Sequence, residues 1–234
     1  MTSENILENV KEMVKAFSEK INSPEVAKWI IDKPEEWMKP SLYPEFYGSA
    51  AKIILACRED IQRKVDKASG RSSARLTSLK WFAKEALAAY NRSLHGLYKD
   101  EFDKWSLCSG HWIVRLSGDV ECLPHLDIEH NMPFKSGTLF EQNKKVEQTE
   151  IEPLNMAALK EAVTANKKDP KPYIIEHNGE RFGFNPKFLY NALNVLGSGT
   201  KCYVSNPKAP MFLVSENGEE EALILPINLE SSRR

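Results

Sequence analysis

One pattern constrains the fold of this chain more than any other: an amphipathic helix followed by three strand-like segments occurs twice. The first copy covers about residues 75–117 and the second about 185–228. The identity between the copies is negligible, so the repeat is one of pattern alone. Because two such units can pack their helices on one side of a shared sheet, the pattern predicts an α+β fold with a mostly antiparallel sheet.

The elements of the two copies follow from apolar spacing. In the first copy we expect a helix from residue 75 and strands at 94–98, 104–108 and 112–116; in the second, a helix at 185–196 and strands at 201–205, 211–214 and 222–227. A hairpin with an Asn178-Gly179 turn precedes the second helix. The insert between the copies, about 118–171, is irregular and polar, with one convincing helix at 155–165.

Residues 1–70 are predicted to form a separate helical unit. Apolar residues recur at helical spacing from Ile6 to Ile21, and Ser23-Pro24 is typical of a helix start. A longer helix at about 49–67 ends before Gly70. We therefore expect a helical unit at 1–70 and a second domain at 75–234 that carries the insert.

The charge and the cysteines exclude several classes of protein. The 32 basic and 33 acidic residues give a net charge of −1, which excludes a uniformly basic nucleic-acid coat. Apolar runs reach only about five residues, against roughly 20 for a membrane span, and the N-terminus lacks a signal-peptide pattern. The 4 cysteines include no CxxC pair and are typical of reduced thiols. The sequence predicts a cytoplasmic protein without a membrane partner.

No arrangement of residues predicts catalysis. His125 and His130 flank two acidic residues, but a spacing of five places the imidazoles on different helical faces, which favours a solvated loop over a metal site. Cys108 and His111 lie near the ends of strands, where side chains alternate faces. The glycine-rich segment 197–201 follows a helix and precedes a strand, the reverse of a phosphate-binding loop. We therefore expect no enzyme, no metal and no cofactor.

Three lysines beside the two repeat helices are candidates for DNA contact. Lys80 and Lys84 lie one turn apart on the first helix, and Lys187 begins the second. If they converge on one surface, they can follow a phosphate backbone without reading the base sequence. The alternative, ordinary solvated lysines, stays open.

Three segments resemble the bacterial replicative sliding clamp, the beta subunit of DNA polymerase III. They are Ser106–Leu116, similar to the clamp's strand–turn–strand with a Gly-His turn; Phe184–Leu193, similar to its Phe-Asn helix start; and Ala222–Leu229, similar to its last strand. Their order and spacing both fit, over roughly 75–116 and 172–229. In size the chain resembles short clamp-like proteins of phages and mobile elements.

The resemblance implies a clamp-like domain with a shallow apolar pocket for short linear motifs of partner proteins. The matching positions are Gly110, His111, Ile113, Leu223, Leu225 and Pro226. Gly110 would allow close approach of a backbone, His111 would form a polar rim, and the aliphatic residues would form the floor. The alternative is that the aliphatic residues are ordinary core.

The sequence departs from the clamp pattern at two of its arginine positions, where Trp112 and Asn228 stand. A ring around DNA would also require a homo-oligomer of this short chain. The leading hypothesis is a non-enzymatic sliding-clamp-like protein of DNA replication or repair that binds partner peptides and double-stranded DNA. The alternative is a phage-type inhibitor or decoy that binds a host protein through aromatic residues of the helical unit. Those residues are Trp29, Trp37, Tyr43, Phe46 and Tyr47.

Overall fold

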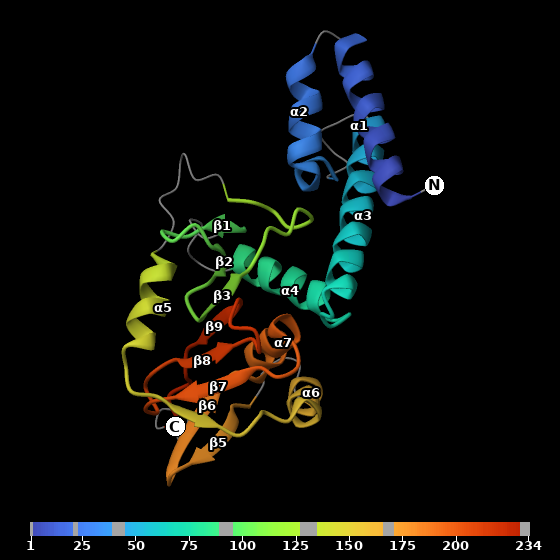
Figure 1. Cartoon of the computed structure of the whole chain (residues 1–234). Helices are drawn as coiled ribbons and strands as arrows, with labels where there is room; N and C mark the ends of the chain where they lie inside the picture. Colours follow the sequence, from blue (N-terminus) through green and yellow to red (C-terminus); the bar gives the residue numbers. More distant parts are fainter. Residues whose placement is uncertain are drawn as a thin grey trace. The chain divides into compact units, whose positions relative to one another are not determined.

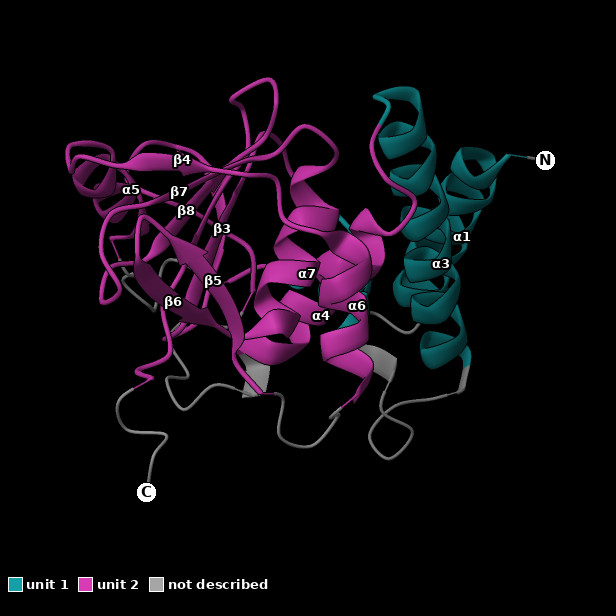
Figure 2. Ribbon diagram, turned by 90° about the horizontal axis from the view of Figure 1, so that it is seen from below, with its two compact units in different colours: residues 1–70, 120–124 teal, residues 71–119, 125–234 magenta. Residues whose placement is uncertain are grey.

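The chain divides into two compact units (Figure 2). One comprises residues 1–70 with 120–124, and the other comprises 71–119 with 125–234. The structure, a computed structural model, describes residues 2–20, 23–38, 45–88, 96–126, 135–165 and 171–229. Within these residues no helix is both long enough and apolar enough to cross a membrane.

The first unit is helical, as the sequence predicts. Its elements are α1 (Ser3–Lys20), α2 (Pro24–Asp32), the 3-10 helix η1 (Pro34–Met38) and α3 (Glu45–Ala68). Helix α3 begins at Glu45, earlier than predicted. The reason is that the aromatic rings of Phe46 and Tyr47 pack on Phe17 of α1, with centroids 4.7 and 5.5 Å away, so the first turn of α3 is stabilised by tertiary contact.

The aromatic residues that suggested a docking surface on this unit differ in exposure. Tyr47 is buried in the core with Val14 and Ile30, and Phe46 packs against the same cluster. Trp29 is 43% exposed, and its indole N–H donates to Glu36 at 2.8 Å. The side chains of Trp37 and Tyr43 lie outside the described residues. Part of this set is therefore core.

The second unit contains a seven-stranded antiparallel sheet in the order β1-β2-β3-β9-β8-β7-β4 (Figure 1). The strands are β1 (Tyr98–Lys99), β2 (Trp105–Cys108), β3 (Trp112–Leu116), β4 (Thr149–Ile151), β7 (Lys201–Val204), β8 (Met211–Val214) and β9 (Glu221–Ile224). Strands β3 and β9 pair at its centre, with Ile113 opposite Leu223, and so join the two copies of the repeat.

Two repeat helices, α4 (Arg75–Ala88) and α7 (Pro186–Leu196), pack against each other and cover one face of the sheet (Figures 1 and 2). Phe82 of α4 packs on Trp112 of β3 with ring centroids 4.4 Å apart, and Trp81 lies 6.0 Å from Phe188 of α7. Helix α6 (Met156–Ala165) packs on α7. The α+β fold and the placement of both helices on one side of the sheet are confirmed.

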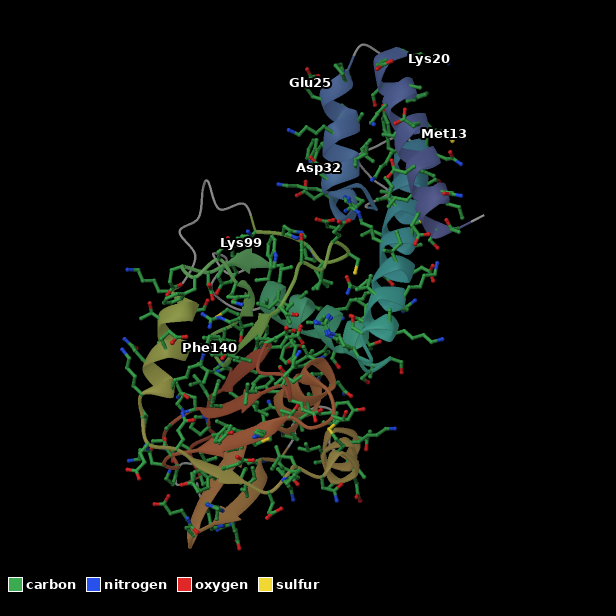
Figure 3. The ribbon with its side chains drawn as sticks, viewed as in Figure 1. Met13, Lys20, Glu25, Asp32, Lys99 and Phe140 are labelled. Carbon is green, nitrogen blue, oxygen red and sulfur yellow. The ribbon has the colours of Figure 1, made fainter. Side chains whose placement is uncertain are left out.

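The insert is more regular than the sequence predicts. In addition to α6 it forms α5 (Ser136–Lys144), which lies on the opposite face of the sheet from α4 and α7, and β4, which extends the sheet beside β7. The predicted irregular insert is therefore wrong at these two elements. Ser136, Gly137 and Thr138 are poor helix formers, and α5 is stabilised through the burial of Phe140 (Figure 3).

The predicted hairpin is present as β5 (Tyr173–His177) and β6 (Glu180–Phe184). Its turn places Asn178 at φ 50° and Gly179 at φ 80°, the left-handed conformation that an Asn-Gly turn favours. The predicted last strand is shorter than expected, because β9 ends at Ile224 and Pro226 instead forms a bridge with Phe184.

Candidate partner-binding pocket

A pocket of about 450 Å³ lies on the α5 side of the sheet, where the β2–β3 turn meets the end of β9. Pockets of this size are typical of sites that take a small ligand or the side chains of a peptide. Its lining residues are Cys108, Ser109, Gly110, Trp112, Ile113, Leu139, Gln142, Asn143, Val146, Pro210, Leu223 and Leu225. Neutral side chains form the whole lining.

The central pair of strands forms the floor of the pocket. Ile113 of β3 lies opposite Leu223 of β9, and their exposed fractions are 6% and 5%. Leu225 follows β9 and is 42% exposed; its backbone N–H donates to the carbonyl oxygen of His111 at 2.9 Å. The floor thus passes from the buried core to an aliphatic side chain that a ligand can cover.

The β2–β3 turn forms the open rim. The backbone N–H of Ser109 donates to the carbonyl of Trp112 at 2.9 Å, and the Ser109 hydroxyl accepts from the N–H of His111 at 3.1 Å. A Cβ atom built on Gly110 would meet no atom of the protein within 4 Å. No internal close contact therefore requires glycine here, and the absence of a side chain leaves the rim accessible to a ligand.

Helix α5 and the turn that follows it form the outer wall of the pocket. Leu139, Gln142 and Asn143 face the pocket from the helix, and Val146, which is 49% exposed, continues the wall. The side chain of Gln148 donates to the backbone carbonyl of Asn143 at 2.9 Å and also bonds its side-chain oxygen. Because the insert was predicted to be irregular, sequence reasoning missed this wall; the only local signal is the spacing of Leu139, Gln142, Asn143 and Val146 on one helical face.

Cys108, the last residue of β2, is one of the residues that line the pocket. Cys108 is fully buried, and burial raises the pKa of its thiol to about 12, so the thiolate is scarcely populated near neutral pH. All 4 cysteines are free and buried. Cys108 and His111 are not brought together, because the His111 ring stacks on Phe188 of α7.

Four of the six predicted pocket residues line the pocket: Gly110, Ile113, Leu223 and Leu225. The other two do not. The ring of His111 lies 6.4 Å from that of Phe188, with their planes 14° apart, and Pro226 bridges to Phe184. His111 therefore lies beside the pocket, on the α7 side of the turn.

The three candidate DNA-contact lysines lie on the two repeat helices. Lys80 and Lys84 are exposed on α4, and Lys187 is half-buried in the first turn of α7, the helix on which α4 packs. His125 pairs with Asp119 at 2.7 Å, whereas His130 lies outside the described residues. Among the side chains that the structure describes, no group of three or more His, Cys, Asp or Glu residues could hold a metal.

No protein-family model and no curated protein matches this chain. Among solved structures it is similar to a putative DNA polymerase III beta subunit from Eubacterium rectale, with 23% identity and a TM-score of 0.36, over 54% of this chain and 41% of that one. It is also similar to the Helicobacter pylori beta clamp bound to a DNA ligase peptide, with 12% identity and a TM-score of 0.40, over 66% of this chain and 63% of that one. A third similar structure is the C. crescentus beta sliding clamp, with 10% identity and a TM-score of 0.37, over 65% of this chain and 64% of that one. The chain thus spans less than two thirds of each.

Proposed function

We propose that this protein is a non-enzymatic, clamp-like binding protein of DNA replication or repair that captures a short peptide segment of a partner in the pocket. One observation carries the proposal: an apolar pocket of about 450 Å³ opens beside the Gly110 turn and the end of β9. These are two of the segments whose sequence resembles the replicative clamps. The pocket therefore lies where the resemblance predicts partner binding.

The lining determines what kind of segment fits. Ile113, Leu223 and Leu225 offer aliphatic surface, so an aliphatic or aromatic side chain of the partner would be the anchor. Full burial of one such side chain contributes about 1.5–3 kcal/mol, and because association itself has an entropic cost, the peptide would need more than one anchor. From the pocket the peptide would continue over Gly110 to the His111 ring and Pro226, which keeps both as proposed contacts.

Leu225 provides the most direct test. Because its side chain is 42% exposed, Leu225→Glu places a carboxylate in the pocket without burying a charge in the fold. We expect the affinity for the DNA ligase peptide that the H. pylori clamp binds to fall about 100-fold, measured by fluorescence anisotropy with the labelled peptide. Val65→Glu on α3, at a site 49% exposed, is the matched control and should leave the affinity unchanged. Equal binding by Leu225→Glu and wild type, or no binding by wild type at millimolar peptide, would refute the proposal.

The proposal includes a weak, salt-dependent contact of Lys80, Lys84 and Lys187 with double-stranded DNA. It is supported by the exposure of Lys80 and Lys84 and by the packing of their helix on the one that carries Lys187. The alternative function, an inhibitor or decoy that acts through the helical unit, stays a prediction.

A further inference from the structure

The floor of the pocket and a group of charged side chains lie on the same pair of strands. Ile113 of β3 and Leu223 of β9, which form the floor, are cross-strand partners. Arg115 and Glu221 lie two residues from them on the same two strands and are also cross-strand partners. Side chains two residues apart on a strand share a face. The charged pair therefore lies next to the floor, on the face that α5 covers.

Helix α5 bonds to this charged pair. Lys144, in its last turn, lies 2.6 Å from Glu221 and 3.2 Å from Glu141, and Glu141 in turn lies 3.6 Å from Arg115. Arg115 pairs with Glu221 at 3.0 Å and with Asp100 at 2.8 Å. We call these five residues the ion cluster. The side chains of Asp100, Arg115 and Glu221 are at most 8% exposed, so water screens their interactions little.

The first turn of α5 is attached separately. The backbone N–H groups of Gly137 and Thr138 donate to the carboxylate of Glu101. A Cβ atom on Gly137 would lie 2.5 Å from Phe102 and 2.7 Å from Arg115, so the helix sits directly against the sheet there. The C-terminal half of α5, which carries Gln142 and Asn143 of the pocket wall, contacts the charged pair of the sheet through Lys144 at 2.6 Å and through Glu141 at 3.6 Å, so Lys144 makes the shorter contact.

We propose that the ion cluster is a latch that holds the C-terminal half of α5 in place as the outer wall of the pocket, with Lys144 as the positioning residue. The sequence of α5 contains poor helix formers, so its position depends on tertiary contacts. Without the lysine charge, Glu221 would remain on a buried face with less compensation, and the wall would separate from the floor. The effect on peptide binding rests on the function proposed above; the attachment of α5 does not.

The test uses the full chain with three substitutions: Lys144→Met, Lys144→Arg and Lys145→Met. Lys145 is the neighbouring exposed lysine and serves as the matched control. By hydrogen–deuterium exchange, we expect the amides of the last turn of α5 to exchange about tenfold faster in Lys144→Met than in wild type, with the sheet unchanged. Lys144→Arg should restore slow exchange.

Peptide kinetics distinguish a positioning role from a purely structural one. If the wall is in place in about one tenth of the Lys144→Met molecules, the apparent association rate falls about tenfold. The dissociation rate should stay the same, because the bound state is unaltered. Should Lys144→Met fail to fold, Glu141→Gln, which removes a half-exposed member of the cluster, is the second variant.

Unchanged α5 exchange in Lys144→Met, or equal acceleration in Lys145→Met, would overturn the latch. Faster exchange with unaltered association would overturn its role in the pocket. If wild-type protein binds no peptide, the proposed function fails, and the exchange measurement alone decides whether the latch exists.

Discussion

Glu220 is the residue whose loss should destabilise the second unit most clearly. It precedes β9, is 4% exposed, and lies 2.7 Å from the Arg75 guanidinium at the start of α4. Arg75 is itself 1% exposed, and Arg71 lies 3.3 Å from the same carboxylate oxygen. The Ser117 hydroxyl donates to that oxygen at 3.0 Å. One carboxylate thus attaches the start of α4 to the end of β3 and the start of β9.

The substitution Glu220→Gln keeps the size of the side chain and removes its charge. Breaking a buried pair from one side costs about 3–5 kcal/mol, because the remaining charge stays buried. Since Glu220→Gln keeps one acceptor oxygen, we expect the lower end, about 3 kcal/mol of the 5–15 kcal/mol typical of a domain. For a unit of this size that corresponds to a fall in Tm of roughly 6–12 °C.

Urea unfolding followed by circular dichroism measures this change. Glu219→Gln, at the exposed neighbouring position, is the control and should lie within about 0.5 kcal/mol of wild type. A double-mutant cycle with Arg75→Met should show a coupling energy above about 1 kcal/mol. A Glu220→Gln protein as stable as the control, or additive effects in the cycle, would refute the reasoning.

Two further predictions concern DNA and pH. Lys80→Glu combined with Lys84→Glu should weaken binding to duplex DNA and make the slope of log K against log salt shallower by about two. The control, Lys145→Glu combined with Lys208→Glu, should change neither the affinity nor the slope. An equal loss of affinity in both double variants would contradict the proposed contact. Burial raises the pKa of both Cys108 and Cys202 to about 12, from 9.0 in the unfolded chain. Between these two pKa values the two thiols lose their protons in the unfolded chain but keep them in the folded protein. The free energy of unfolding should therefore fall as pH rises from 9 towards 12. Urea titrations at pH 8 and pH 10.5 should show a smaller fall in the Cys108→Ala/Cys202→Ala protein, and an equal fall would contradict the prediction.

Local signals account for the parts of the second unit that the sequence predicts correctly. Asn185 caps α7 through the N–H of Lys187, and Pro186 begins the helix. The Asn178-Gly179 turn defines the hairpin. Each signal acts within a few residues, so it can be interpreted without the fold. The floor of the pocket is different, because Ile113 and Leu223 are expected there only from the resemblance of their segments to the replicative clamps, and strand residues of an ordinary core would show the same pattern.

The outer wall of the pocket and the direction of His111 depend on contacts far along the chain. Helix α5 begins with poor helix formers and is stabilised by Phe140 against the sheet and by the pairing of Lys144 with Glu221. His111 projects from the turn towards Phe188, a residue of the second repeat. No periodic pattern in the sequence near α5 or near His111 indicates these distant partners.

The sequence by itself thus determined the helical unit and the repeated helix-and-strand pattern, because periodic apolar residues and turn residues act locally. Only the tertiary structure decided that the insert covers the sheet, that α5 completes the pocket, and which side of the turn His111 takes. Those outcomes depend on burial and on charge pairs between segments far apart in the sequence, and such contacts exist only once the chain has folded.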